Sequence, residues 1–146
     1  MELRLVAHCL LNPCSRVRGL EAPGPRPEGP LIQIPCPEAL YLGLDRWAVT
    51  RNQLDLPEYR RFCRRILEHC LDMAEMHSRQ GFPIVIVGVA KSPSCGVCST
   101  TEGYRGGLVR EQEHRHVPGR GVFMEELERE LSRRGVPAEW QEAGDV

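Results

Sequence analysis

Three short apolar runs limit what this chain can fold into more than any other feature of its sequence. They cover residues 3–7, 31–34 and 84–89, and each has the length of a β-strand. The third run is β-branched and apolar except at Gly88, as expected for a central strand buried on both faces. A long stretch of helical periodicity, residues 57–80, precedes it. Strands that alternate with long helices are typical of an α/β fold with a mostly parallel sheet flanked by helices.

The expected helix over residues 57–80 has clear ends and one apolar face. Pro57 suits its first turn, and Gly81 is a stop signal. A second helix is expected over residues 122–134 and a short edge strand over residues 138–141. The apolar residues of the long helix recur three and four positions apart, on one side: Tyr59, Phe62, Cys63, Ile66, Leu67, Cys70, Leu71 and Ala74. We therefore interpret its two cysteines as core residues.

The segment between the first two strands, residues 9–30, is predicted to be an extended surface loop. Its second half alternates prolines with glycines, and no helix tolerates that spacing. Neither internal repeats nor a domain linker are evident. At 146 residues, with 41% hydrophobic residues, the chain suits one domain over residues 1–146.

Charge and cysteine content narrow the class of protein. The formal net charge of −1 gives no reason to expect a nucleic-acid or membrane partner. Residues 1–12 lack a signal-peptide pattern, and no apolar run is long enough to cross a bilayer, so we expect a cytoplasmic protein. Seven cysteines in a reducing cytosol are expected to serve metal binding or catalysis rather than a disulfide framework.

A cysteine follows each of the three apolar runs: Cys9, Cys36 and Cys95. The carboxyl ends of parallel strands open on one crevice, where α/β folds bind ligands, so these three thiols are expected to meet. Three protein ligands are typical of a metal centre that keeps one position open for a substrate. Thiolates suit either zinc or an iron–sulfur cluster, and the spacing alone leaves both open.

Glu38 and Ser92 are the polar residues expected to act beside these thiols. Each lies within three positions of one of the three cysteines, so each is predicted to enter the same crevice. A carboxylate beside an open metal site serves as general base for water, and a hydroxyl relays or donates a proton. The alternative is a surface position for Glu38 and an N-cap or turn role for Ser92.

Cys95 and Cys98 form a C-x-x-C motif, which is a redox pair in some folds when it opens a helix. The glycine-rich stretch over residues 103–107 argues against a helix after it, so a thiol–disulfide oxidoreductase is the second choice.

Three further residues have open or minor roles. Cys14 is a spare ligand, a sulfur acceptor or an exposed residue, and the sequence does not rank these. His114 and His116 form an H-x-H pair able to bind metal, but their polar neighbours favour a solvated loop.

Four motifs together resemble the ordered motifs of the thiouracil desulfidase (TudS) family, and the resemblance spans most of the chain. In chain order they are Cys9-Leu10-Leu11, Cys36-Pro37-Glu38, Ser92-Pro93-Ser94-Cys95-Gly96 and Gly119-Arg120-Gly121-Val122. The resemblance implies a 4Fe-4S cluster held by Cys9, Cys36 and Cys95, with one open iron that binds the sulfur of a thiolated nucleobase. It also implies that Glu38 and Ser92 are the catalytic pair.

The reaction implied by this resemblance is a non-redox desulfuration. Glu38 deprotonates a water that attacks the thiocarbonyl carbon, and Ser92 helps to move protons. The sulfur leaves on the cluster as a 4Fe-5S species and departs as hydrogen sulfide, with the oxo compound as product. From its position alone, we hypothesise that Lys91 stabilises the negative charge that develops.

Two segments depart from the family pattern, so the chain resembles a divergent subfamily. Residues 14–19 lack the acidic residue usual after the first motif, residues 39–43 replace a glycine-rich stretch, and Cys98 is an addition. The expected substrate is a free thiobase, a thionucleoside or another small thiocarbonyl compound. A non-catalytic metal or sulfur carrier remains an alternative to the enzyme.

Overall fold

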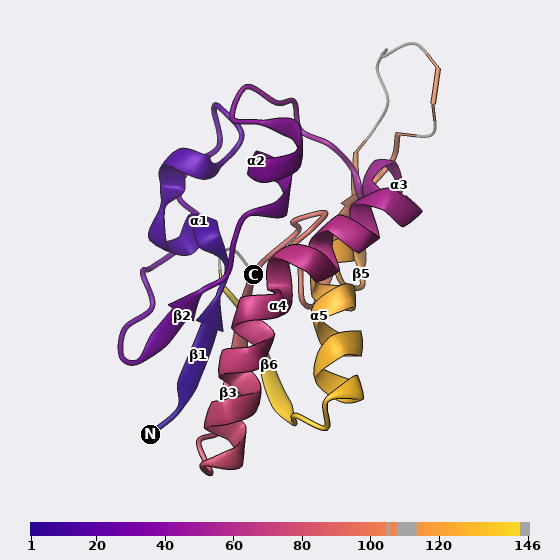
Figure 1. Ribbon diagram of the computed structural model, residues 1–146. Coiled ribbons are helices and arrows are strands. Elements are labelled where there is room, and N and C mark those ends of the chain that lie inside the picture. The colour runs from indigo at the N-terminus through magenta and orange to yellow at the C-terminus, as the bar shows by residue number, and fades with distance from the viewer. Residues whose placement is uncertain (105, 108–113, 144–146) are drawn as a thin grey trace.

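A four-stranded parallel sheet forms the centre of the protein. The structure is a computed structural model that describes residues 1–104, 106–107 and 114–143. The strands are β1 (Leu3–Val6), β2 (Leu31–Gln33), β3 (Ile84–Val89) and β6 (Ala138–Ala143), in the order β2-β1-β3-β6 (Figure 1). All three strand pairs are parallel, and every residue of β3 is buried. The predicted α/β class, the three strands and the edge strand are therefore confirmed.

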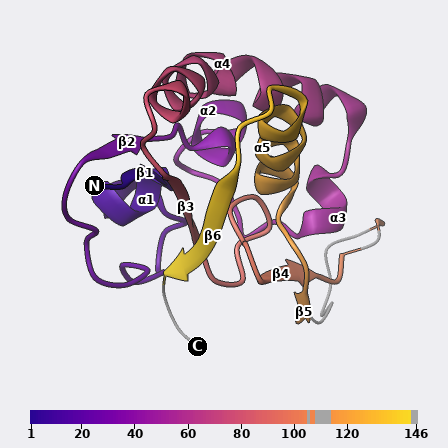
Figure 2. The ribbon, with the colours of Figure 1, turned by 90° about the horizontal axis from the view of Figure 1, so that it is seen from below.

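Two amphipathic helices cover one face of this sheet. They are α4 (Pro57–Arg79) and α5 (Val122–Arg133), which pack against each other (Figure 2). The connections from β2 to β3 and from β3 to β6 run in the same direction across the sheet, and parallel crossovers are right-handed. Both helices must therefore lie on the same face. The predicted helices are confirmed to within one residue at their ends.

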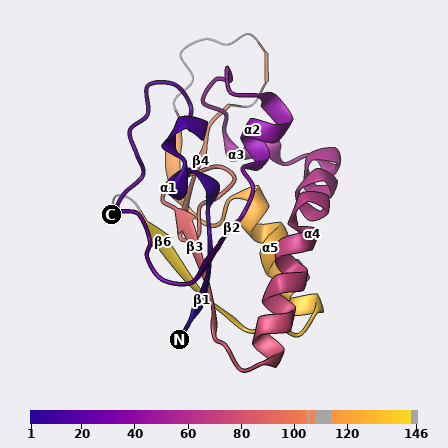
Figure 3. The same ribbon diagram turned by 60° about the vertical axis from the view of Figure 1, so that its left-hand side comes forward.

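The connection from β1 to β2 runs in the opposite direction, so it lies on the opposite face of the sheet (Figures 2 and 3). The guanidinium of Arg4 on β1 donates to the Glu28 carbonyl at 3.0 Å and so ties the end of this connection to the sheet. Its first part is not the loop predicted from residue 9. It contains α1 (His8–Leu11) and a short 3-10 helix, η1 (Pro13–Ser15).

Two more short helices and a hairpin were not predicted. Helix α2 (Pro37–Leu42) begins directly after Cys36, and α3 (Arg51–Leu54) is stabilised by a capping box between Thr50 and Gln53. After β3, strands β4 (Ser99–Glu102) and β5 (Arg115–Pro118) form an antiparallel pair. These elements lie beyond the carboxyl ends of the sheet strands (Figure 1). They form the surroundings of the site described below.

A buried carboxylate joins the two long helices. Glu126 of α5 is only 1% exposed and is hydrogen-bonded to Arg60 and Arg64 of α4 and to Arg129 of α5. The Arg60 contact is 2.9 Å and the Arg129 contact is 2.6 Å.

Within the described part of the chain, no helix has the length and apolarity needed to cross a membrane.

Candidate functional site

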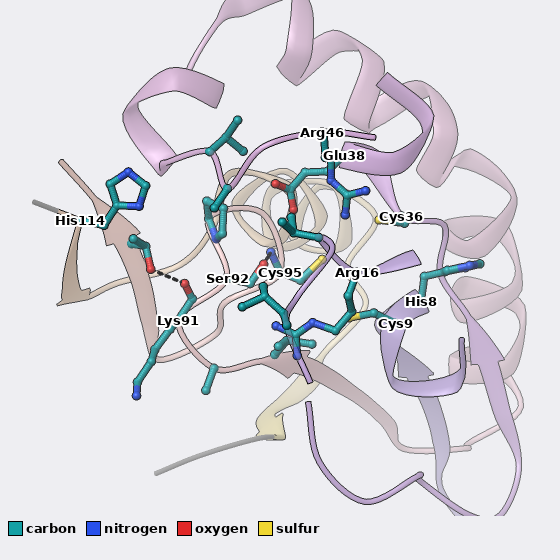
Figure 4. Close-up of a pocket in the computed structure, with 18 of the residues that line it drawn as sticks. His8, Cys9, Arg16, Cys36, Glu38, Arg46, Lys91, Ser92, Cys95 and His114 are labelled. Carbon is teal, nitrogen blue, oxygen red and sulfur yellow. Dashed lines mark hydrogen bonds between the residues drawn. The ribbon is translucent and has the colours of Figure 1, made fainter. Parts of the chain in front are cut away.

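A cavity of about 370 Å³ opens at the carboxyl ends of β1 and β3. These two strands are neighbours, but the chain leaves them toward opposite edges of the sheet, which makes this the topological switch point where such folds bind ligands. All the residues singled out from the sequence as a ligand trio and catalytic pair line this cavity (Figure 4): Cys9, Cys36, Cys95, Glu38 and Ser92. Lys91 lines it as well.

The three cysteines reach the cavity from three separate elements. Cys9 lies in α1, Cys36 precedes α2, and Cys95 follows β3 in a turn. Burial raises the pKa of Cys9 to about 11 and raises the pKa of Cys36 as well. Burial also raises the pKa of Cys95, and the other two thiols raise it further, so the three are close enough to interact electrostatically. Three such thiols become thiolates only beside a compensating positive charge, such as bound metal.

Cys36 is fixed by the helix that follows it. It occupies the N-cap position of α2, and its Sγ accepts the backbone N–H of Ala39 at 3.4 Å. Pro37, the first residue of the helix, has a fixed φ and no N–H to satisfy. The next residue, Glu38, therefore enters the cavity from the first turn of α2, as the spacing predicted.

The turn that carries Cys95 is held against the N-terminus of α5. The N–H of Val122 donates to the Pro93 carbonyl at 2.9 Å, and that of Met124 donates to the Ser94 carbonyl at 3.1 Å. Gly121 permits this approach, because a Cβ there would lie only 2.4 Å from the Ser94 carbonyl oxygen. Gly121, the second glycine of the fourth motif, thus has a packing role beside the turn.

Ser92 makes the turn bond that was the alternative to a catalytic role. Its Oγ accepts the backbone N–H of Cys95 at 2.9 Å. A hydroxyl has a single hydrogen, and this bond uses only an acceptor lone pair. Within the described ranges no group accepts the Ser92 proton, which leaves it available to a ligand in the cavity, so the turn role and a proton-donating role are compatible.

Glu38 is buried, so the surface position considered for it is wrong. It is 8% exposed, and burial raises the pKa of its carboxyl, while the charges of Arg46 and Arg16 act in the opposite direction. Arg46 is itself buried, with Nη2 donating to the Ser15 carbonyl at 2.7 Å and Nη1 to the Gly43 carbonyl at 3.1 Å. Its Nε has no hydrogen-bond partner among the described residues.

Arg16 and Arg46 also line the cavity, and no sequence pattern indicated a role for either. Both lie in irregular segments, where no periodicity predicts which way a side chain points. Their positive charges offset the negative charge of three thiolates and a carboxylate, which is costly in a buried space. The rest of the lining is mostly apolar and includes Val49 and Val89. Such a lining is typical of small-molecule sites.

His114 and His116 are exposed, as expected of a solvated segment, but both also line the cavity. Figure 4 shows His114 on the opposite side of the cavity from Cys9 and Cys36. The site therefore has a side rich in thiols and a second side formed by the hairpin and Lys91 (Figure 4).

The remaining cysteines lie elsewhere. Cys63 and Cys70 are buried on α4, which confirms the prediction that they are core residues. Cys14 and Cys98 are exposed and are not part of the cavity lining. After Cys98 the chain enters strand β4 rather than a helix, so the C-x-x-C motif lacks the helix start that favours a redox pair.

The thiol trio does not converge as the ligands of one ion do. Among the described residues, no three His, Cys, Asp or Glu side chains are placed to hold a single metal ion. An iron–sulfur cluster requires a different ligand geometry, because each thiolate binds its own iron and the sulfurs need not meet at one point.

Comparison with known proteins gives one relative. A protein of Methanocaldococcus jannaschii, described only as uncharacterised, is 27% identical in an alignment 149 positions long, which covers 92% of this chain and 81% of the relative. No protein-family model matches the chain. No solved structure matches it either. The chain is therefore similar to an archaeal protein of similar size whose name states no activity.

Proposed function

We propose that this protein is an iron–sulfur-dependent desulfidase that replaces the sulfur of a small thiocarbonyl compound with oxygen. One observation carries the proposal: three thiols from distant parts of the chain, a buried carboxylate and a hydroxyl line one cavity at the switch point of the sheet. The resemblance of the four motifs to the TudS family supports the same reading, and 2-thiouracil is the first substrate to test.

The residues present fit a cluster held by Cys9, Cys36 and Cys95. They supply three thiol ligands from the cavity lining, and a cluster held by three protein ligands would keep one iron open for a substrate. A cluster with three thiolates carries net negative charge, and the cavity provides Arg16 and Arg46 to balance it. When bound, such a cluster would supply a Lewis-acidic iron to which a thiocarbonyl sulfur binds.

Glu38 and Ser92 provide the groups that move protons. The net reaction takes one thiocarbonyl group and one water to one carbonyl group and one hydrogen sulfide, so both protons of the water must reach the sulfur. Glu38 takes the first proton as the water attacks the carbon. The Ser92 oxygen is fixed by the Cys95 N–H, and no residue that the structure describes accepts its hydrogen, which suits Ser92 to donate within the same cavity.

The decisive experiment combines metal analysis with turnover. After anaerobic reconstitution with iron and sulfide, we expect ~4 iron atoms and ~4 acid-labile sulfides per chain. The loaded protein should then release sulfide from 2-thiouracil. Substitution of Cys9, Cys36 or Cys95 by serine should lower the iron content, whereas Cys14→Ser should not. A protein that binds zinc instead, or no metal, contradicts the proposal.

A further inference from the structure

Lys91 has an unusual backbone conformation beside the proposed catalytic serine. Its φ is 66°, and among the described residues it is the one non-glycine residue with a positive φ. A residue with a Cβ is strained in this left-handed region. Such strain persists only where the surroundings hold the backbone in place, and it is common at functional sites.

Three consecutive hydroxyls of β4 hold this part of the chain. The Ser99 Oγ accepts the Lys91 N–H at 3.0 Å, and the Thr101 Oγ1 donates to the Lys91 carbonyl at 2.6 Å. Between them, Thr100 Oγ1 donates to the Ser92 carbonyl at 3.1 Å. The backbone N–H and the carbonyl of Lys91 are thus both bonded to side chains of β4.

Residues from two other strands orient these hydroxyls. On β6, Glu142 Oε1 accepts the Ser99 hydroxyl proton at 3.2 Å, which leaves a Ser99 lone pair for the Lys91 N–H. On β5, His116 Nδ1 lies 2.9 Å from Thr101 Oγ1. Because the single Thr101 proton goes to the Lys91 carbonyl, His116 must carry its proton on Nδ1 and donate it to Thr101.

The conformation of Lys91 determines where the next residues point. Ser92 follows it directly, and its carbonyl also accepts the Gly96 N–H at 3.1 Å. Its Oγ bonds to the Cys95 N–H, so Ser92 and Cys95 move as one turn. A change at Lys91 would redirect both the Ser92 hydroxyl and the Cys95 thiol within the cavity.

We propose that Ser99 and Thr101 are positioning residues for the reaction, which hold Lys91 in its left-handed conformation and thereby aim Ser92 and Cys95. This proposal rests on the proposed function for its effect on turnover. Its structural claim, that Ser99 and Thr101 hold the Lys91 backbone, needs neither a cluster nor turnover. In this proposal the Lys91 backbone, rather than its ammonium group, positions Ser92 and Cys95.

Two matched substitutions at Thr101 separate the hydroxyl from side-chain shape. Thr101→Val keeps the branched shape and removes the donor, whereas Thr101→Ser keeps the donor. We expect the valine variant to lose about tenfold or more in kcat with a small change in KM, in line with the cost of left-handed backbone. The serine variant should retain most of the activity. Equal activities in the two variants would overturn the proposal.

A second substitution at Lys91 tests whether the effect passes through the backbone. In the Thr101→Val background, Lys91→Gly should give a higher kcat than Lys91→Ala, because glycine adopts positive φ without strain. Alanine keeps the strain of the left-handed conformation, so Lys91→Ala in the same background should leave kcat lower. Both changes remove the ammonium group, so its loss cannot explain a difference between them. Equal kcat in the glycine and alanine variants would contradict the backbone role.

Amide hydrogen exchange gives a readout that does not need turnover. In the metal-free protein, the Lys91 amide should exchange slowly in the wild type and in Thr101→Ser, and about tenfold faster in Thr101→Val. Slow exchange in all three would sink the proposal even if the wild type is an active desulfidase. If the wild type releases no sulfide but exchange follows the expected order, the proposed function fails and the structural role of Thr101 stands.

Discussion

The side chain of Ser92 accepts the backbone N–H of Cys95, at 2.9 Å, at the end of the central strand. This bond joins a proposed proton donor to a proposed cluster ligand within one turn. The two residues therefore keep a constant relative position, while the rest of the cavity is contributed by other segments. Ser92 therefore has two roles, support of the turn and proton donation, and substitutions can distinguish them.

Ser92→Ala should lower kcat without preventing cluster assembly. Loss of a proton donor in catalysis commonly costs about 10²–10⁴ in rate, and loss of the Cys95 contact costs about 1 kcal/mol of stability. Iron content per chain and sulfide release measure the two effects separately. Ser92→Thr, which keeps a hydroxyl, is the matched control and should retain more activity. If Ser92→Ala turns over as the wild type does, Ser92 serves only the turn.

Glu38→Gln distinguishes an enzyme from a carrier of metal or sulfur. The amide has nearly the shape of the carboxyl but cannot accept a proton from water, so we expect sulfide release to fall by about 10²–10⁴. Because Glu38 is not a proposed ligand, the iron content should remain near that of the wild type. Loss of iron together with activity would indicate a role for Glu38 in assembly rather than in proton transfer.

How far the sequence predicted this structure depends on the length and periodicity of each element. Strand β3 and helix α4 were predicted because one is a continuous apolar run and the other has an unbroken apolar face over many turns. Strand β4, with the sequence Ser-Thr-Thr-Glu, has no apolar alternation to reveal it. Its identity as a strand follows from its partner β5 and from its hydrogen bonds to the turn after β3.

The site was predictable where chemistry coincided with strand ends. Cys9, Cys36 and Cys95 follow apolar runs, so the geometry of a parallel sheet was enough to bring them together. Arg46 had no such signal, because it lies outside helices and strands and its direction is set by contacts with Ser15 and Gly43. Residues placed by tertiary contacts of this kind cannot be found from local sequence patterns.

Cys98→Ser tests the oxidoreductase alternative. Cys98 is exposed and outside the cavity, so a desulfidase should keep its iron content and its turnover when this thiol is lost. A redox pair requires both cysteines, and its disulfide reductase activity would vanish. Cys95→Ser is the informative comparison, since it should lower the iron content under the proposed function. Similar losses from both substitutions would favour the redox pair.

The Glu126 cluster should make stability depend on pH. Burial pushes the pKa of this carboxyl upward, but the hydrogen bonds from Arg64 and Arg60 outweigh it and hold the pKa below the ordinary 4.5. A carboxyl with a lowered folded-state pKa contributes stability that is complete above the unfolded value and is lost as pH falls through the folded value. The urea midpoint should therefore decrease below about pH 4.5, once the carboxyl begins to bind protons in the unfolded chain.

Substitution isolates this contribution from that of other carboxyls. At about pH 7, Glu126→Gln should lower the free energy of unfolding by about 1.5–3 kcal/mol, the range for hydrogen bonds to charged groups. Glu128→Gln, which breaks the more exposed pair with Arg120, should cost at most about 1 kcal/mol. The Glu126 difference should shrink as pH falls to about 3, because the wild-type carboxyl is then increasingly protonated. A difference that stays constant over this range would show that Glu126 acts through packing rather than charge.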